Sequence, residues 1–194
     1  MRFCDEQTFG FGWIDDTGSI ARTSHALVVD GGVWLVDPVA WLDAIDRVQV
    51  VGEPRGVLQL LDRHERDAPT LAAQLGIPHH RVPTARIAGA PFEFLKVASS
   101  RYWREVALWW PEPRVLVCAD ALGTIGYFRA PGEAIGVHPL LRLKPPKELR
   151  RVYPEHILTG HGEGVHEDAA VALHAALITA RRRLPAALWA SIRR

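Results

Sequence analysis

Cysteine is scarce in this sequence of 194 residues. Only Cys4 and Cys118 occur, there is no CxxC pair, and Cys118 lies in the apolar run RVLVCADAL. A lone cysteine in such a run is typically a buried thiol. We therefore expect no disulfide framework.

Long apolar runs are also missing. None approaches the roughly 18 residues that a membrane-spanning helix needs. The first residues, MRFCDEQTFGFG, carry acids at positions 5 and 6 and contain no apolar core of a signal peptide. We therefore expect a cytoplasmic, reducing location and no membrane partner.

An excess of charge of one sign is the third absence. The sequence has 23 Lys and Arg against 22 Asp and Glu, which gives a formal net charge of +1. This balance gives no global electrostatic case for nucleic acid as a partner. The run Arg181–Arg183 is better explained as the basic last turn of a helix, where it complements the helix dipole. The expected partner is a small molecule whose identity the sequence does not reveal.

What is present is typical of a globular protein. Hydrophobic residues make up 48% and charged residues 23% of the chain. The length fits one domain, which we take as residues 1–194. The segment 131–149 is rich in proline and is the longest irregular region, so it forms either a lid or an ordered surface crossing.

Local patterns predict mostly strands in the first two thirds of the chain. Alternation, β-branched residues and turn residues predict hairpins over 24–40 and 105–120 and strands over 47–51, 56–61, 79–83, 92–99 and 156–160. Pro69 and Gly76 fit the start and end of a helix over 67–76. A longer helix is predicted over 166–184, and Pro185 should break it before the terminal piece 186–194.

The stretch LLDRHERDAP, residues 60–69, holds the most reactive side chains at a predicted strand end. His64, Glu65 and Asp67 lie between a strand and a helix, together with one further acid and two arginines. Imidazole and carboxylate groups in a loop of this kind are typical metal ligands. A solvent-facing or locally bonded His64 and an Asp67 that only caps the helix are the plainer alternatives.

The order of these elements resembles the metallo-β-lactamase superfamily over about residues 20–183. The features that carry the resemblance are the strand–loop–helix around residues 60–69, a hairpin that ends in CADAL, and a strand followed by TGHG and a helix. The resemblance implies an α+β fold, a four-layer αββα sandwich with metals at one edge. In that family the ligands come from a His-x-His-x-Asp-His motif, a later His, an Asp in a GD pair and a His in a GHG-like turn.

The resemblance assigns each ligand position of the family to one residue of this sequence. With Asp67 as the aspartate of the motif, Arg63 and Glu65 take the two preceding histidine positions and Ala68 takes the last. The later His falls on Arg101. Asp120 matches the GD aspartate and His161 matches the final histidine. Asp67, Asp120 and His161 thus keep the ligand types of the family.

Two arginines at ligand positions predict a metal site that has been lost or rewired. Arginine stays protonated in proteins and offers no lone pair. It can instead bind carboxylates with two parallel hydrogen bonds. We therefore expect Arg63 and Arg101 to pair with Asp67, Asp120 and Glu65, and His161 to complete the network. This hypothesis describes a binding protein that is a non-classical or inactive hydrolase and needs no cofactor.

A metal-dependent hydrolase is the alternative. Asp67, Asp120, His161 and Glu65 would then hold a single Zn or Fe ion, and a metal-bound water would act as nucleophile. A shift of one residue would instead place His64 with Asp67 and His161 around one metal, although it would turn the side chain to the other face of a strand. A homodimer is the assembly that we leave open.

Overall fold

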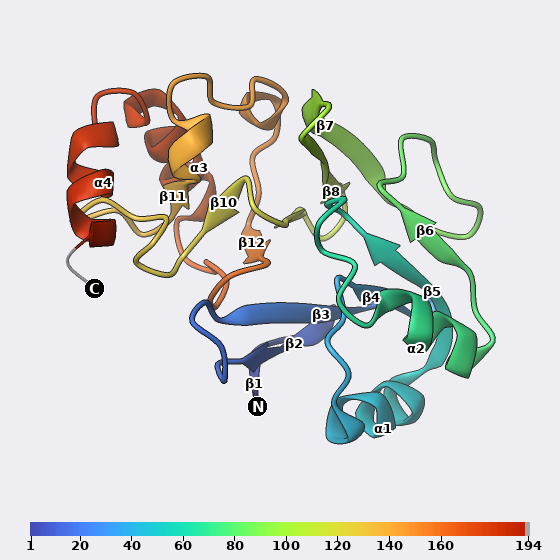
Figure 1. The fold of residues 1–194 in the computed structure, drawn as a ribbon. Helices are drawn as coiled ribbons and strands as arrows, with labels where there is room; N and C mark the ends of the chain where they lie inside the picture. The colour runs from blue at the N-terminus through green and yellow to red at the C-terminus, as the bar shows by residue number, and fades with distance from the viewer. Residues whose placement is uncertain (193–194) are drawn as a thin grey trace.

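The computed structural model describes residues 1–192, and its first sheet holds six strands in their order along the chain (Figure 1). They are β1 (Arg2–Gln7), β2 (Gly10–Asp15), β3 (Arg22–Val29), β4 (Gly32–Val36), β5 (Glu53–Gln59) and β6 (His79–Arg81). The strands β1 to β4 pair antiparallel, whereas β5 is parallel to β4 and to β6. The carboxyl ends of β4 and β5 therefore meet at one edge of this sheet.

The second sheet has four strands in the order β12-β9-β8-β7. They are β7 (Glu93–Ser100), β8 (Trp103–Trp110), β9 (Val115–Cys118) and β12 (His156–Thr159). Because β12 is parallel to β9, the carboxyl ends of these two strands also share an edge. A short antiparallel pair, β10 (Leu122–Gly123) and β11 (Gly136–Val137), lies between β9 and β12 in the chain.

Helices cover the outer faces of both sheets (Figure 1). They are α1 (Leu42–Val51) and α2 (Ala68–Leu75) on the first sheet, and α3 (Ala169–Thr179) and α4 (Leu184–Ile192) beside the second. Three apolar clusters fill the spaces between these layers. One lies between the first sheet and α1 and α2, one between the two sheets, and one between the second sheet and α3. The expected four-layer αββα sandwich is therefore the observed fold. No helix within residues 1–192 is long and apolar enough to cross a membrane.

Most of the predicted elements form. Both hairpins are present as β3–β4 and β8–β9, and α2 ends at Gly76, whose left-handed φ of 67° suits glycine. The predicted strand over 47–51 is wrong, because these residues belong to α1. Their valines suggest a strand, but Ala44 and Val48, one helical turn apart, are the buried positions.

The predicted long C-terminal helix is two helices. α3 ends at Thr179 and α4 begins at Leu184, with Pro185 in its first turn rather than after a break. The three arginines, 181–183, therefore form the connection between α3 and α4 instead of the last turn of one helix.

The irregular segment 131–149 is an ordered crossing. It contains β11 and the short 3₁₀ helix η1 (Pro139–Leu141), and it leads into η2 (Glu148–Arg151). Arg142 is fully buried in it. Its guanidinium donates to Glu133 Oε1 at 3.1 Å and to the Phe128 carbonyl at 2.7 Å. The buried ion pair closes the segment on itself, and the bond to Phe128 fixes it against the preceding loop.

We predict that Arg142→Met destabilises the protein strongly. Removing one partner of a buried ion pair leaves the other charge uncompensated, which costs about 3–5 kcal/mol. Chemical denaturation should show this loss in the free energy of unfolding. The exposed Arg150 provides the control, since Arg150→Met should change that free energy by less than about 0.5 kcal/mol. Equal effects of the two substitutions would contradict the assigned role of Arg142.

Candidate metal centre

Four strand ends bring polar side chains to the same edge of the sandwich. Asp37 follows β4, and His64 lies in the loop after β5. Asp120 follows β9, and His161 follows β12. Because each pair of strands is parallel, all four side chains come from carboxyl ends, two from each sheet. Loops at such strand ends commonly carry functional groups.

His64, Asp120 and His161 converge at this edge. Asp120 Oδ1 lies 3.1 Å from His64 Nε2 and 2.9 Å from His161 Nε2. The two Nε2 atoms are 3.3 Å apart. This is the one group of three or more potential ligands within residues 1–192 whose ligand atoms lie close enough to hold a metal ion.

The other ring nitrogen of each histidine has a fixed partner. His161 Nδ1 lies 2.7 Å from the Ala21 carbonyl, which can only accept, so this nitrogen carries a proton. His64 Nδ1 lies 3.0 Å from Asp37 Oδ2, and its natural role there is also to donate. With neutral rings, both Nε2 lone pairs therefore face the Asp120 carboxylate.

Three lone pairs that face one another require a positive charge between them. Zinc ligands lie about 2.0–2.2 Å from the ion, so tetrahedral ligands are about 3.3 Å from one another. The separations of 2.9–3.3 Å fit that requirement. Carboxylate and carbonyl partners on the second nitrogen are also typical of metal-bound histidine. Protonation of the histidines is the other way to supply the charge.

Buried groups hold Asp120 in place. Glu105 Oε1 accepts from the backbone N–H groups of Asp120 and Ala121 at 2.9 and 2.8 Å, and its other oxygen accepts from Trp103 Nε1. Burial, followed by the charge of Asp120, raises the pKa of Glu105 to about 7. Burial also disfavours the charged form of Asp120, but the hydrogen bonds from His161 and His64 prevail and lower its pKa.

Asp120 and Asp37 also change the pKa of His64. Burial and the nearby Arg66 each favour the neutral imidazole, but hydrogen bonds to Asp120 and Asp37 outweigh them and raise the pKa of His64. The cluster therefore attracts positive charge, whether a proton or a metal cation.

Two arginines flank the cluster. Arg63 donates to Asp120 Oδ2 at 3.2 Å and to the Tyr102 carbonyl at 2.9 Å, and it stacks over Trp103. Arg66 donates to three backbone carbonyls: Thr23 at 2.6 Å, Asp37 at 2.7 Å and Gly160 at 3.0 Å. These carbonyls belong to both sheets, so Arg66 ties the edges of the two sheets together.

The predicted network forms only in part. Arg63, Asp120 and His161 come together as expected. Arg101 is exposed and stacks on Tyr102, and Glu65 is exposed too, so neither joins the carboxylates. Asp67 sits at the helix start, yet its carboxylate accepts from the Ala40 N–H at 2.8 Å, away from the cluster. The ligand sets that contain Asp67 or Glu65 therefore do not assemble.

His64 is the residue that sequence reasoning misplaced. It is 7% exposed and lies inside the cluster instead of facing solvent. The expectation extended strand alternation through the loop, but β5 ends at Gln59 and residues 62–67 form turns. Side-chain alternation does not hold there. Two further residues gave no sequence signal: Asp37, in LVDP, and Glu105, inside a strand.

The structure favours aligning the His-x-His-x-Asp-His motif one residue earlier in the sequence than the first assignment did. With His64 as the second histidine of the motif, Asp62 takes the first histidine position and Arg66 takes the aspartate position. Asp67 then falls on the last histidine. In this register Arg66, rather than Arg63, is the arginine that replaces a ligand.

Aromatic side chains form a wall beside the cluster. Phe128 stacks on His161 with ring centroids 5.5 Å apart, and His138 packs against Phe128, Trp103 and Tyr127. His138 Nδ1 accepts from the Leu140 N–H at the start of η1. Burial, the first of several influences, lowers the pKa of His138 to about 4, so this ring stays neutral at pH 7.

We predict that His138 contributes a pH-dependent part of the stability. Between about pH 6.5 and 4 the unfolded chain binds a proton at this site and the folded chain does not, so stability falls as the pH falls. In His138→Asn the amide oxygen can still accept from Leu140 without titrating. Denaturation of both proteins from pH 7 to 4 should show their stability difference shrinking, by up to about 3 kcal/mol. A constant difference would contradict this prediction.

Comparisons with known proteins bear on the fold. No protein-family model matches the sequence, and no curated protein matches it significantly. Solved structures do match. A metallo-β-lactamase from Erythrobacter litoralis shares 13% identity with a TM-score of 0.59, covering 93% of this chain and 92% of that one.

Two further structures agree. The DIM-1 metallo-β-lactamase exposed to ceftazidime shares 12% identity with a TM-score of 0.58, covering 92% of this chain and 97% of its own. A flavodiiron protein from Giardia intestinalis shares 12% identity with a TM-score of 0.59, covering 95% of this chain and 59% of that one. The architecture that the sequence predicts is confirmed: this chain has the metallo-β-lactamase fold.

Proposed function

We propose that the protein is a metal-dependent hydrolase with one metal ion per chain, held by His64, Asp120 and His161. The observation that carries this proposal is the convergence of two Nε2 atoms and one carboxylate oxygen within 3.3 Å of one another. Two histidines and one carboxylate suit Zn²⁺ or Fe²⁺, and three protein ligands are typical of catalytic rather than structural zinc sites.

The chemistry that a divalent ion supplies at such a site is general. It lowers the pKa of bound water to near neutrality and polarises a substrate carbonyl or phosphoryl oxygen. The chain's own residues would orient the ligands. Asp37 holds the His64 ring through Nδ1, and the Ala21 carbonyl does the same for His161. Glu105 fixes the backbone of Asp120, so the carboxylate is aimed before any ligand binds.

The positive charge of Arg66 favours one metal ion per chain rather than two. The guanidinium is cationic at every pH of interest and binds three carbonyls at the same edge. A second divalent ion near it would be repelled, and the two remaining carboxylates of the motif, Asp67 and Asp62, accept from the backbone N–H groups of Ala40 and Arg104. The proposal is therefore a mononuclear centre rather than the dinuclear one that the resemblance implies.

A binding protein without metal is the second candidate, favoured by Arg63. This residue already neutralises one oxygen of Asp120. If both cluster histidines carried protons, their N–H groups would donate to Asp120 and Asp37, and every polar group would be satisfied. The site would then bind a small molecule without catalysing hydrolysis.

We predict that Asp37→Asn weakens zinc binding by about 10–100-fold, because the loss of such an outer hydrogen bond typically costs that much. His161→Ala should weaken it further, since it removes a ligand. Competition with a chromophoric chelator would give the affinities. His174→Gln is the matched control, because His174 bonds only the Val152 carbonyl and stacks on Tyr153, and it should bind zinc like the parent. Unchanged affinity in both site variants would refute the assigned ligands.

We predict measurable hydrolysis in a panel of thioesters, phosphodiesters and lactams. The activity should exceed the buffer blank, disappear with a chelator and return with added metal. Asp120→Asn should abolish it without unfolding the protein, because the amide is close in size to the carboxylate but a poorer ligand. Activity that survives both the chelator and Asp120→Asn would contradict metal-dependent catalysis at this cluster.

A further inference from the structure

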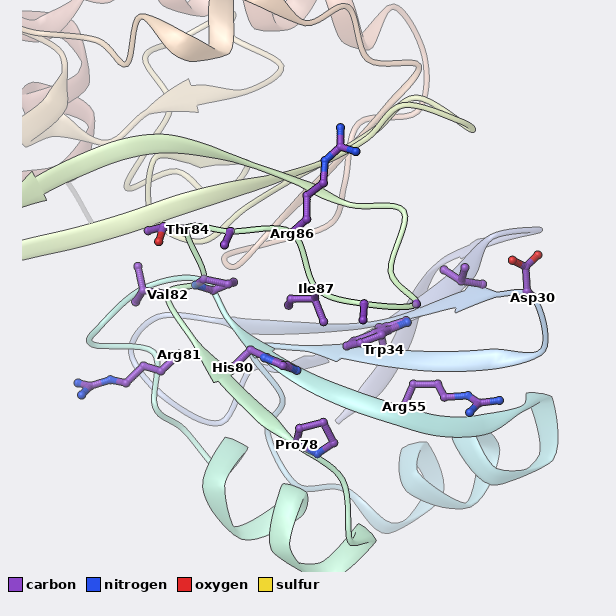
Figure 2. A pocket seen from close by; sticks show the side chains of 15 residues that line it. Asp30, Trp34, Arg55, Pro78, His80, Arg81, Val82, Thr84, Arg86 and Ile87 are labelled. Carbon is purple, nitrogen blue, oxygen red and sulfur yellow. The ribbon is translucent and has the colours of Figure 1, made fainter.

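A second site lies away from the metal centre. An open cavity of about 890 Å³ is lined by residues of β3, β4, β5 and β6 and by the segment 82–89 that follows β6. Figure 2 shows Thr84, Arg86 and Ile87 of this segment on one side, with Trp34, His80 and Arg55 on the strands opposite. None of the residues that line it belongs to the metal cluster.

The mouth of this cavity is basic. Arg55, Arg81 and Arg86 line it, and Asp30 is the one acid among the lining residues. In Figure 2 the three guanidinium groups extend outward from the rim rather than into the interior. Guanidinium groups are the side chains best suited to hold carboxylate or phosphate groups.

A second cavity adjoins the first and extends the basic surface. Its volume is about 510 Å³, and it shares Arg81, Val82 and Thr84 with the first. It adds Lys96 and Arg104 and has no acid among its lining residues. The whole chain carries a net charge of only +1, so this concentration of cations is a local feature.

The interior of the first cavity is apolar. Val29, Trp34, Val82 and Ile87 line it, together with prolines and alanines. His80 also lies in the wall, with its ring 6.1 Å from that of Trp34, and its buried Nε2 has no hydrogen-bond partner. A cavity with an apolar interior and a few polar groups is typical of a small-molecule site.

Two of the rim arginines, Arg55 and Arg86, are available to a ligand, whereas Arg81 donates to the Asp62 carbonyl. Arg55 pairs with Glu53 at 2.8 Å, and both side chains are more than half exposed. Arg86 is 84% exposed and lies 3.5 Å from Glu93. Surface ion pairs of this kind contribute little to stability, so an incoming anion can replace them at small cost.

We propose that this cavity binds an organic anion whose apolar body enters the interior and whose carboxylate or phosphate group meets Arg55 or Arg86 at the mouth. The site is independent of the proposed hydrolase function. Single-stranded nucleic acid fits less well, because bases stack on accessible aromatic faces and Trp34 is only 3% exposed.

Calorimetric titration of the full chain tests this proposal with named probes. Benzoate and phenyl phosphate carry an apolar ring and a charge, benzyl alcohol lacks the charge, and acetate and inorganic phosphate lack the ring. At least one of the first two should bind more tightly than all three of the others. The relative affinity of benzoate and phenyl phosphate identifies the preferred anionic group. Binding should be the same with and without a chelator, which separates this site from the metal centre.

The double variant Arg55→Gln/Arg86→Gln should weaken that binding by at least about tenfold, the effect of losing one charge-assisted hydrogen bond. Arg151→Gln is the matched control, because Arg151 is an exposed arginine paired with Glu148 outside both cavities, and it should change nothing. Four results would each overturn the proposal: no binding by either charged ring compound, equal binding of benzyl alcohol, equal loss in the control, or tighter binding of a single-stranded oligonucleotide that the double variant weakens.

Discussion

The contact of Asp120 Oδ1 with the Nε2 atoms of His64 and His161 joins the two sheets at the edge where the candidate metal centre lies. His64 comes from the first sheet, and the other two residues come from the second. The supporting groups lie in both sheets as well, since Asp37, which bonds the His64 ring, follows β4, and Glu105, which accepts from the backbone N–H of Asp120, lies in β8. These contacts hold the strand ends of the two sheets together.

Two arginines determine how this edge differs from the dinuclear site that the resemblance implies. Arg66 carries a permanent positive charge where the shifted alignment places the aspartate of the motif, and it donates hydrogen bonds to three backbone carbonyls. Its backbone has a left-handed φ of 44°, and that of Asp37 has 43°. Conformations of this kind cost energy in residues other than glycine and persist where surrounding contacts impose them. Arg63 acts differently, because it binds the outer oxygen of Asp120 and leaves Oδ1 to the histidines.

The sequence predicts the fold better than the site, and particular residues show why. The hairpins depend on alternation and turn residues, and α2 depends on Pro69 and Gly76, all of which are local signals. The strand predicted over 47–51 was wrong because β-branched residues such as Val48, Val50 and Val51 favour strands, whereas packing on the first sheet imposed a helix. Asp120 and His161 were predicted because CADAL and TGHG match two ligand motifs of the family that the sequence resembles.

Asp37 and Arg66 escaped prediction, and His64 was predicted as a ligand only in the alternative with a shift of one residue, because the roles of all three depend on turn geometry. Sequence spacing fixes side-chain direction along a strand, but it does not do so in a loop whose backbone includes a left-handed residue. The predicted pairing of Arg101 with the carboxylates was wrong for a related reason. The turn between β7 and β8 leaves its side chain exposed beside Tyr102.

The metal content of the purified protein tests the central claim most directly. Elemental mass spectrometry on protein prepared without chelators, with anomalous scattering to locate the ion in crystals, would give both number and position. The account predicts about one Zn or Fe per chain, placed among His64, Asp120 and His161. Protein that takes up no divalent metal even when it is supplied, or two ions per chain, would contradict it.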